Sequence, residues 1–220
     1  MKKRPLKIVR ILITALLIPI FLTLAYRFVP PPSTLMLRDI LFFTLPNRDW
    51  VSLKNISASA VNGAIASEDS AFCTHHGFDF KQLERSVEKS FDRDKPVRAT
   101  STISQQTAKN LFLWHGRSWL RKGLEVPLTG ILELLLPKKR ILEIYLNIAE
   151  WGPHIYGIEA ASRYYFNTPA RNLSAQQAAL LIAALPSPKR RNAAKPSLFH
   201  LVLAASISRK INQQDTSCLR

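Results

Sequence analysis

The sequence predicts a mostly α-helical, single globular domain behind one N-terminal transmembrane helix. An uncharged apolar stretch lies close to the N-terminus. Through the rest of the chain, apolar residues recur at helical spacing. Alternating strand patterns are nearly absent, the chain has only seven glycines, and a hydrophobic content of 47% suffices for a core.

The membrane segment is predicted at residues 11–29. Ile11 to Tyr26 carries no charge, and with its apolar flanks it reaches the ~20 residues that span a bilayer. Residues 1–10 are rich in lysine and arginine, which predicts a cytoplasmic basic tail and an exported body. The alternative is a cleaved signal peptide, for which Thr23 and Ala25 offer only a weak cleavage site.

The exported body divides into three parts. Residues 30–50 begin with a proline run and are predicted as a linker and membrane-proximal segment. Residues 51–212 form the globular domain, and residues 213–220 form a tail. Apolar residues early in the body are expected to pack in the core, with dipping into the bilayer as the alternative: Leu35, Leu37, Leu41, Phe42 and Phe43.

The apolar spacing predicts the helices of the body. Pro127 should restart or kink the helix that contains it. Residues 92–100 are polar and are predicted as a loop. The expected helices cover about residues 56–69, 81–91, 102–114, 118–136, 138–149, 158–166, 174–184 and 198–211.

The net charge of +16 points to an anionic partner: nucleic acid, a membrane surface or a phosphorylated substrate. An exported body and the lack of interleaved aromatic and basic residues argue against nucleic acid. The cysteines are expected to stay unpaired, because Cys73 lies in an acidic cluster and Cys218 lies in a tail expected to fray. Neither has the spacing of zinc ligands.

Glu68 and Asp69 are the first candidate site residues. They are expected at the C-terminal end of a helix, where a carboxylate opposes the helix dipole and its pKa rises towards that of a base. The alternative is an ordinary solvated helix end. His75 is expected to hold a turn by hydrogen bonds, and Gly77 suits that turn.

A second group surrounds a predicted helix start. Thr102 and Gln105 fit a capping box, and Gln105 and Lys109 share a helix face. Free backbone N–H groups at a helix start favour anions, so hydroxyls, amides and a lysine here suit sugar and phosphate oxygens. A capped surface helix is the alternative.

A third group places cations around one acid. Arg117, Arg121 and Lys122 precede Glu125, and Arg121 lies one helical turn before it. A plain surface salt bridge is the alternative, but three cations exceed what one acid needs. The surplus positive charge suits a pyrophosphate.

These segments resemble the peptidoglycan glycosyltransferase family, lysozyme-like enzymes that polymerise lipid II. Residues 68–79 match E-D-x-x-F-x-x-H-x-G-x-D, and residues 121–125 match R-K-x-x-E. Residues 99–106 resemble G-G-S-T-I-T-Q-Q, with Ala99 and Thr100 in place of the glycines and Ser104 for threonine. Residues 138–147 match K-x-x-I-L-E-x-Y-L-N, and residues 157–166 resemble G-x-x-A-A-x-x-Y-F, with one additional residue before the final Y-F. The layout is similar to the monofunctional biosynthetic transglycosylase branch.

The resemblance implies a lysozyme-like fold and polymerisation of lipid II with inversion at the donor sugar and release of undecaprenyl pyrophosphate. It implies Glu68 as general base, and Glu125 as a catalytic residue that orients the cations or holds a divalent metal. Magnesium or manganese is used in assays of the family, although no metal ligands are assigned. The residues implied to bind substrate are Asp69, Ser101, Thr102, Gln105, Gln106, Lys109, Arg117, Arg121, Lys122 and Lys138.

The implied partners are lipid II, the growing glycan strand and membrane lipids, with other cell-wall synthesis proteins as candidates. The implied location is the cell inner membrane, crossed once, with the catalytic domain in the periplasm. Two alternatives remain. A lytic hydrolase of the same fold would use Glu68 as an acid but needs no pyrophosphate cradle. A non-catalytic membrane-anchored scaffold would need neither acid nor cations.

Overall fold

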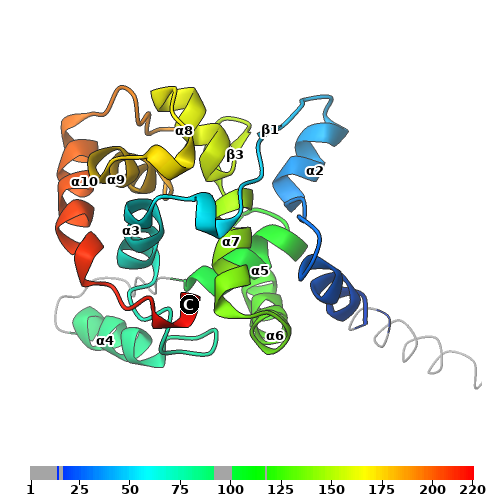
Figure 1. Ribbon diagram of the computed structural model, residues 1–220. Coiled ribbons are helices and arrows are strands. Elements are labelled where there is room, and N and C mark those ends of the chain that lie inside the picture. Colours follow the sequence, from blue (N-terminus) through cyan, green and yellow to red (C-terminus); the bar gives the residue numbers. More distant parts are fainter. Residues whose placement is uncertain (1–13, 15–16, 92–100, 117) are drawn as a thin grey trace, which may run out of the picture.

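The computed structural model describes residue 14 and residues 17–91, 101–116 and 118–220. The body is mostly helical (Figure 1). Its α-helices are α2 (Thr34–Leu41), α3 (Ala58–Glu68), α4 (Phe80–Phe91), α5 (Ile103–Phe112), α6 (Trp119–Leu135), α7 (Lys138–Ile148), α8 (Ile158–Phe166), α9 (Ala175–Ala184) and α10 (Leu198–Lys210). Single-turn helices are η1 (Leu53–Asn55), η2 (Ala170–Asn172), η3 (Ile211–Gln213) and η4 (Ser217–Leu219).

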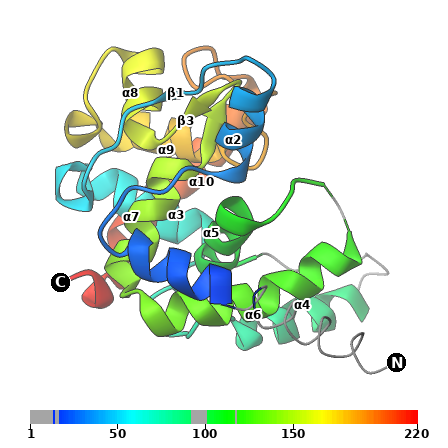
Figure 2. The same cartoon turned by 90° about the vertical axis from the view of Figure 1, so that its right-hand side faces the viewer.

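Helix α7 is the centre of the packing. It contacts α5, α6, α8, η1 and η4, and its residues 141, 142, 144, 145 and 146 are almost completely buried. In Figures 1 and 2, α8, α9 and α10 lie above it, and α4 and α6 lie below it. Helix α3 packs against α9, and the side chain of its last residue, Glu68, is hydrogen-bonded to Gln106 of α5.

The helix predictions are confirmed to within a few residues at most ends. Thr102 caps α5 with the expected capping box, because its hydroxyl accepts from the Gln105 N–H and the Gln105 amide oxygen accepts from the Thr102 N–H. Helix α6 continues through Pro127 as one element.

A small sheet was not predicted. Strand β3 (Ile155–Tyr156) pairs parallel with β1 (Asn47–Arg48) and antiparallel with β2 (Glu150–Gly152). The strands have two or three residues each, too few to give an alternating pattern.

The membrane-proximal segment is fixed to the body by polar contacts. Arg140 of α7 donates to the carbonyl oxygens of Tyr26 (2.8 Å) and Val29 (3.0 Å). Asp39 of α2 accepts from the hydroxyl of Tyr156 (2.6 Å) and from Nδ1 of His154 (2.7 Å). Burial disfavours the charged carboxylate, but these hydrogen bonds outweigh it and lower the pKa of Asp39 to about 2.

Residues 17–26 are helical. Within the described residues, no helix is both long enough and apolar enough to span a bilayer. The predicted span of 11–29 begins in residues that the structure does not describe, and the basic tail of 1–10 lies wholly outside it.

Most of the early apolar residues are not in the core. Leu35 is buried, but Leu37, Leu41, Phe42 and Phe43 are exposed, and Phe43 keeps 98% of its surface accessible. The expectation of core packing is therefore wrong for these four. Helix α2 turns only one face to the body, and its other face and the following turn remain uncovered.

The expectation of unpaired cysteines is wrong, because Cys73 and Cys218 form a disulfide with their Cα atoms 5.3 Å apart. The C-terminal segment does not fray: η4 contacts α7, and Cys218 and Leu219 pack against the core. The acidic residues near Cys73 do not prevent the disulfide either, because the carboxylate of Asp69 is paired with His75.

We expect this disulfide to stabilise the body strongly, because it joins cysteines 145 positions apart and restricts a long loop of the unfolded chain. Replacing both cysteines by serine should lower the free energy of unfolding by about 2–5 kcal/mol in urea titrations. Reductant should destabilise the native protein and leave the double variant unchanged. Equal urea midpoints for the two proteins would contradict this role.

Candidate functional site

Glu68 is the last residue of α3, as predicted, and its side chain is partly buried. Its Oε2 accepts a hydrogen bond of 2.9 Å from Nε2 of Gln106 on α5. The same Nε2 donates to the carbonyl oxygen of Ser101 at 3.2 Å. The carboxylate is thus held against the start of α5.

Asp69 has an internal role. Its side chain is fully buried, accepts from Nε2 of His75 (2.8 and 3.0 Å) and accepts from the backbone N–H of Ile103 (2.9 Å). The Gly77 N–H donates to Nδ1 of His75, so this histidine holds the predicted turn. With no exposed oxygen, Asp69 does not fit the direct substrate contact predicted for it.

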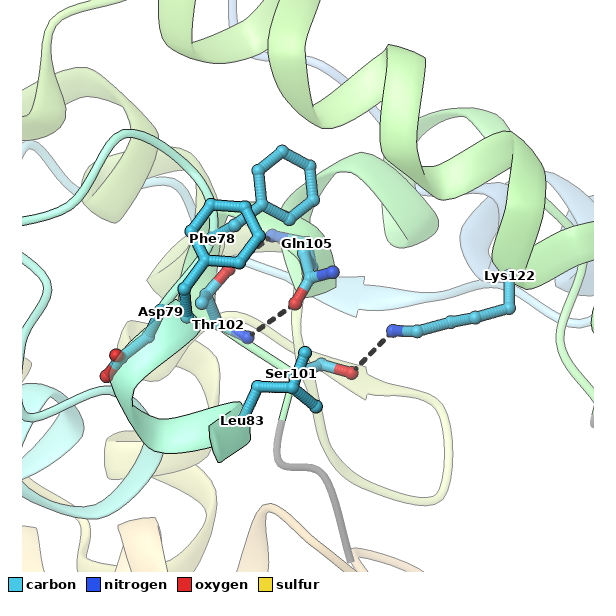
Figure 3. A pocket seen from close by; sticks show the side chains of 8 residues that line it. Phe78, Asp79, Leu83, Ser101, Thr102, Gln105 and Lys122 are labelled. Carbon is cyan, nitrogen blue, oxygen red and sulfur yellow. Dashed lines mark hydrogen bonds between the residues drawn. The ribbon is translucent and has the colours of Figure 1, made fainter. Parts of the chain in front are cut away.

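The start of α5 borders a pocket of about 160 Å³ (Figure 3). The Thr102 hydroxyl is buried and donates to the Gly77 carbonyl, so it does not face a ligand. Gln105 and Ser101 do reach the pocket, and Lys122 points towards Ser101 from α6. The complete lining is Phe78, Asp79, Phe80, Leu83, Ser101, Thr102, Gln105 and Lys122.

Glu125 forms salt bridges with two of the predicted cations, Arg121 and Lys122. It is buried, and its two oxygens pair with Nη1 of Arg121 and with Nζ of Lys122 (2.7 Å). Lys122 Nζ also donates to the Ser101 hydroxyl at 2.9 Å. Glu125 therefore pairs with Arg121 and Lys122 within one helical turn, as the spacing predicts. The position of Lys122 beside Ser101, at the start of α5, comes from the fold.

The charges of this site change one another's pKa values. Burial raises the pKa of Glu68, although the Gln106 hydrogen bond and Lys109 oppose the rise. Burial and the nearby charge of Arg121 lower the pKa of Lys109. A raised carboxylate pKa beside a cationic group is a common arrangement at sites of proton transfer.

Three residues that the sequence did not assign to the site lie near its charges: His115, Arg38 and Lys189. The side chain of His115 reaches the surface, but partial burial and the charges of Lys109, Arg38, Arg121 and Lys189 lower its pKa to about 4. Arg38 comes from α2 and Lys189 from the segment after α9. No sequence spacing connects them with α5 and α6, so only the fold could reveal this group.

Lys138 and Arg117 are the remaining predicted substrate contacts. Nζ of Lys138 pairs with Glu133 at 2.7 Å and lies 4.5 Å from the centre of the Phe72 ring, so the structure gives it an internal partner. Glu133 also accepts from the Ser104 hydroxyl. Arg117 lies outside the described residues.

The described residues do not fit a protein-bound divalent metal. They contain no group of three or more His, Cys, Asp or Glu side chains that could hold an ion. Glu125, the carboxylate considered for this role, is already paired with two cations.

An apolar groove of about 440 Å³ lies on the other side of α6. The residues of helix 17–26 form one wall, and the ends of α5 and the middle of α6 form the others. We call it the apolar groove, and it is lined by Ile18, Pro19, Leu22, Leu111, Phe112, Leu113, Leu124, Pro127, Leu128 and Ile131.

Comparison with known proteins identifies relatives along most of the chain. A family model described as "Transglycosylase" matches residues 38–211. A biosynthetic peptidoglycan transglycosylase of Brucella suis biovar 1 (strain 1330) is 53% identical over 86% of this chain and 84% of its own. Proteins of the same name from Haemophilus influenzae (strain PittEE) and Agrobacterium fabrum (strain C58 / ATCC 33970) are 53% and 47% identical. They align over 80% and 93% of this chain and 77% and 91% of their own.

We expect the Asp69→Asn substitution to destabilise the protein, because either orientation of the amide places its NH2 group against Nε2 of His75, which is itself a donor while Nδ1 accepts from Gly77. The free energy of unfolding should fall by about 1–3 kcal/mol in urea titrations.

Asp79→Asn is the matched control. Asp79 Oδ1 accepts from the Gln82 N–H at the start of α4, and asparagine caps a helix equally well. If both variants unfolded at the wild-type urea concentration, the structural role of Asp69 would be refuted.

Proposed function

Because the chain belongs to the transglycosylase family, we propose that it polymerises lipid II into the glycan strands of the bacterial cell wall. The observation that carries this function is that two features occur together at the start of α5. One is a partly buried carboxylate, Glu68, and the other is a group of cations held by Glu125. One group suits a nucleophilic hydroxyl and the other a pyrophosphate leaving group.

On the acceptor side, Glu68 acts as the general base. The 4-hydroxyl of the acceptor sugar attacks C1 of the donor, its proton passes to Glu68, and the α-linkage becomes β. A carboxylate is too weak a base to ionise the alcohol beforehand, so the proton moves during the attack. The raised pKa of Glu68, caused chiefly by burial, brings it closer to that task.

On the donor side, Arg121, Lys122 and Lys109 neutralise the charge that develops on undecaprenyl pyrophosphate as it leaves. Arg117 belongs to the same proposal, on the sequence alone. Ser101 and Gln105 supply further hydrogen bonds beside Lys122. Glu125 acts by holding the cations in place.

A divalent cation remains part of the proposal only as a companion of the substrate phosphates. Mg²⁺ commonly binds through phosphate oxygens with few protein ligands. Every step described above uses side chains of this chain.

The membrane supplies the substrate and, we propose, holds the enzyme. The apolar groove lies on the face of α6 opposite the cations, since Leu124 follows Lys122 by two positions, about 200° around the helix. An isoprenoid tail that passes around α6 from the pyrophosphate enters this groove. Exposed Leu41, Phe42 and Phe43 suit insertion into the bilayer surface. The proposed topology is a single pass through the inner membrane, with the body in the periplasm.

Two observations favour polymerisation over the alternatives. A lytic hydrolase has no use for Lys122 and Arg121 ordered beside the site, because its leaving group carries no pyrophosphate. A scaffold has no use for a carboxylate whose charged form is disfavoured by burial.

Glu68→Gln should lower the rate of lipid II polymerisation at least 100-fold, because the amide cannot accept the proton. Lys122→Gln should lower it about tenfold or more, because one positive charge is lost beside the pyrophosphate. Both are measured with detergent-solubilised protein and purified lipid II, by electrophoresis of the glycan products.

Lys139→Gln is the matched control, an exposed lysine on the neighbouring helix α7, and should retain the wild-type rate. Full activity of Glu68→Gln would refute the base. Release of sugars from finished glycan strands, without polymerisation, would establish the hydrolase instead.

The proposed topology predicts that protease added to spheroplasts digests the body, while the same protease added to inverted membrane vesicles spares it. The membrane-bound protein should retain residues 1–29 in mass spectrometry. Neutralising Lys2, Lys3, Arg4, Lys7 and Arg10 should reduce the fraction with this orientation. A mature protein that starts after Ala25 would instead establish a cleaved signal peptide.

A further inference from the structure

Tyr145 lies directly behind the proposed base. It belongs to α7, its side chain is 1% exposed, and its hydroxyl donates to Oε1 of Gln106 at 3.3 Å. Ile141, Tyr145 and Ile148 recur at helical spacing, and this pattern alone predicts only a core-facing stripe. A hydroxyl within that core, aimed at the amide that binds Glu68, calls for another explanation.

The neighbours of Gln106 determine which way its amide faces. Nε2 lies 2.9 Å from Glu68 Oε2 and 3.2 Å from the Ser101 carbonyl oxygen. A carbonyl oxygen can only accept hydrogen bonds, and the same holds for the Glu68 carboxylate when it is charged. Oε1 therefore has to meet a donor, and Tyr145 supplies it. A rotated amide would place oxygen against two acceptors.

A bond of 3.3 Å is long for a hydroxyl and contributes little by itself. It matters because of what the rotated amide would cost: the Tyr145 hydroxyl would then have no acceptor, and a buried hydroxyl without an acceptor costs about 1–3 kcal/mol. The tyrosine hydroxyl therefore favours the amide orientation in which Gln106 donates to Glu68. Because α7 packs directly against α5, the backbone holds both side chains in place.

We propose that Tyr145 is a positioning residue for glycan polymerisation, which fixes the Gln106 amide so that Glu68 is held as a hydrogen-bonded carboxylate ready to accept the proton of the attacking hydroxyl. This inference rests on the proposed function of Glu68 as the base.

The charged groups around Glu68 make a pH measurement interpretable. Lys109 faces it from α5 and Asp69 follows it in the chain, with His75 bound to Asp69 and Arg121 acting on Lys109 from α6. A change at Tyr145 leaves these charges in place. Burial, followed by the charges of Glu68 and Asp69, raises the pKa of Tyr145 well above its ordinary value, so it remains a neutral donor at assay pH.

The test is the pH dependence of kcat/KM for lipid II polymerisation by the full-length protein. Only charged Glu68 accepts the proton, so activity falls as pH drops through its pKa. In Tyr145→Phe, Oε1 of Gln106 loses its donor, so the amide is held only by its contacts with Glu68 and Ser101. The hydrogen bond to the charged form of Glu68 is then held less firmly, and the pKa of Glu68 rises. We expect the acidic limb of the pH profile, where kcat/KM falls as the pH is lowered, to move to higher pH by roughly half a unit or more. The rate at higher pH should change less.

Gln106→Met should move the acidic limb in the same direction, because it removes the amide and keeps a side chain of similar length. Adding Tyr145→Phe to Gln106→Met should produce no further shift, since the two residues act through one hydrogen bond. Tyr165→Phe is the control: its hydroxyl donates to the Trp151 carbonyl at 3.4 Å, away from Glu68, and its acidic limb should match wild type.

The outcomes separate this inference from the proposed function. If Glu68→Gln is inactive while Tyr145→Phe keeps the wild-type acidic limb, the base stands and the positioning role is overturned. If Glu68→Gln remains active, the proposed base itself fails. Should Tyr145→Phe not fold, an unshifted acidic limb in Gln106→Met overturns the inference on its own.

Discussion

The buried carboxylate of Asp69 joins the end of α3, the turn that contains His75 and the start of α5. A charged group without exposed surface persists only when its partners replace the lost water, and here a histidine and a backbone N–H do so. The position of the proposed base depends on this contact, because Asp69 ties the end of α3, which carries Glu68, to the start of α5, which carries Gln106.

The two sides of the site obtain their chemistry by the same physical means, a buried acid that arranges polar neighbours. Asp69 aligns the helix start against which Glu68 is held, and Glu125 aligns Arg121 and Lys122 beside Ser101. The acid that remains partly accessible is the one proposed to take the proton. The cations and the apolar groove lie on opposite faces of α6, which suits a substrate that carries both a pyrophosphate and a long lipid.

Features encoded by local spacing could be predicted from the sequence, and contacts made by the fold could not. The capping box of Thr102 and the pairing of Arg121 with Glu125 involve residues within one helical turn, so helix geometry alone suffices. The contact of Tyr145 with the site crosses 39 positions, and the disulfide of Cys218 crosses 145. Helical spacing predicts only a core position for Tyr145, and its place near the chain end predicts fraying for Cys218. Neither pattern contains information about distant partners.

The most direct measurement of this account is the titration of Glu68 itself, followed by NMR of the protein labelled with ¹³C at glutamate side chains, with Glu68→Gln used to assign the resonance. Because burial disfavours its charged form more than Gln106 and Lys109 favour it, Glu68 should titrate above the ordinary glutamate value of 4.5. Titration at or below that value would mean that the carboxylate is not tuned as a base, and the catalytic assignment would be contradicted.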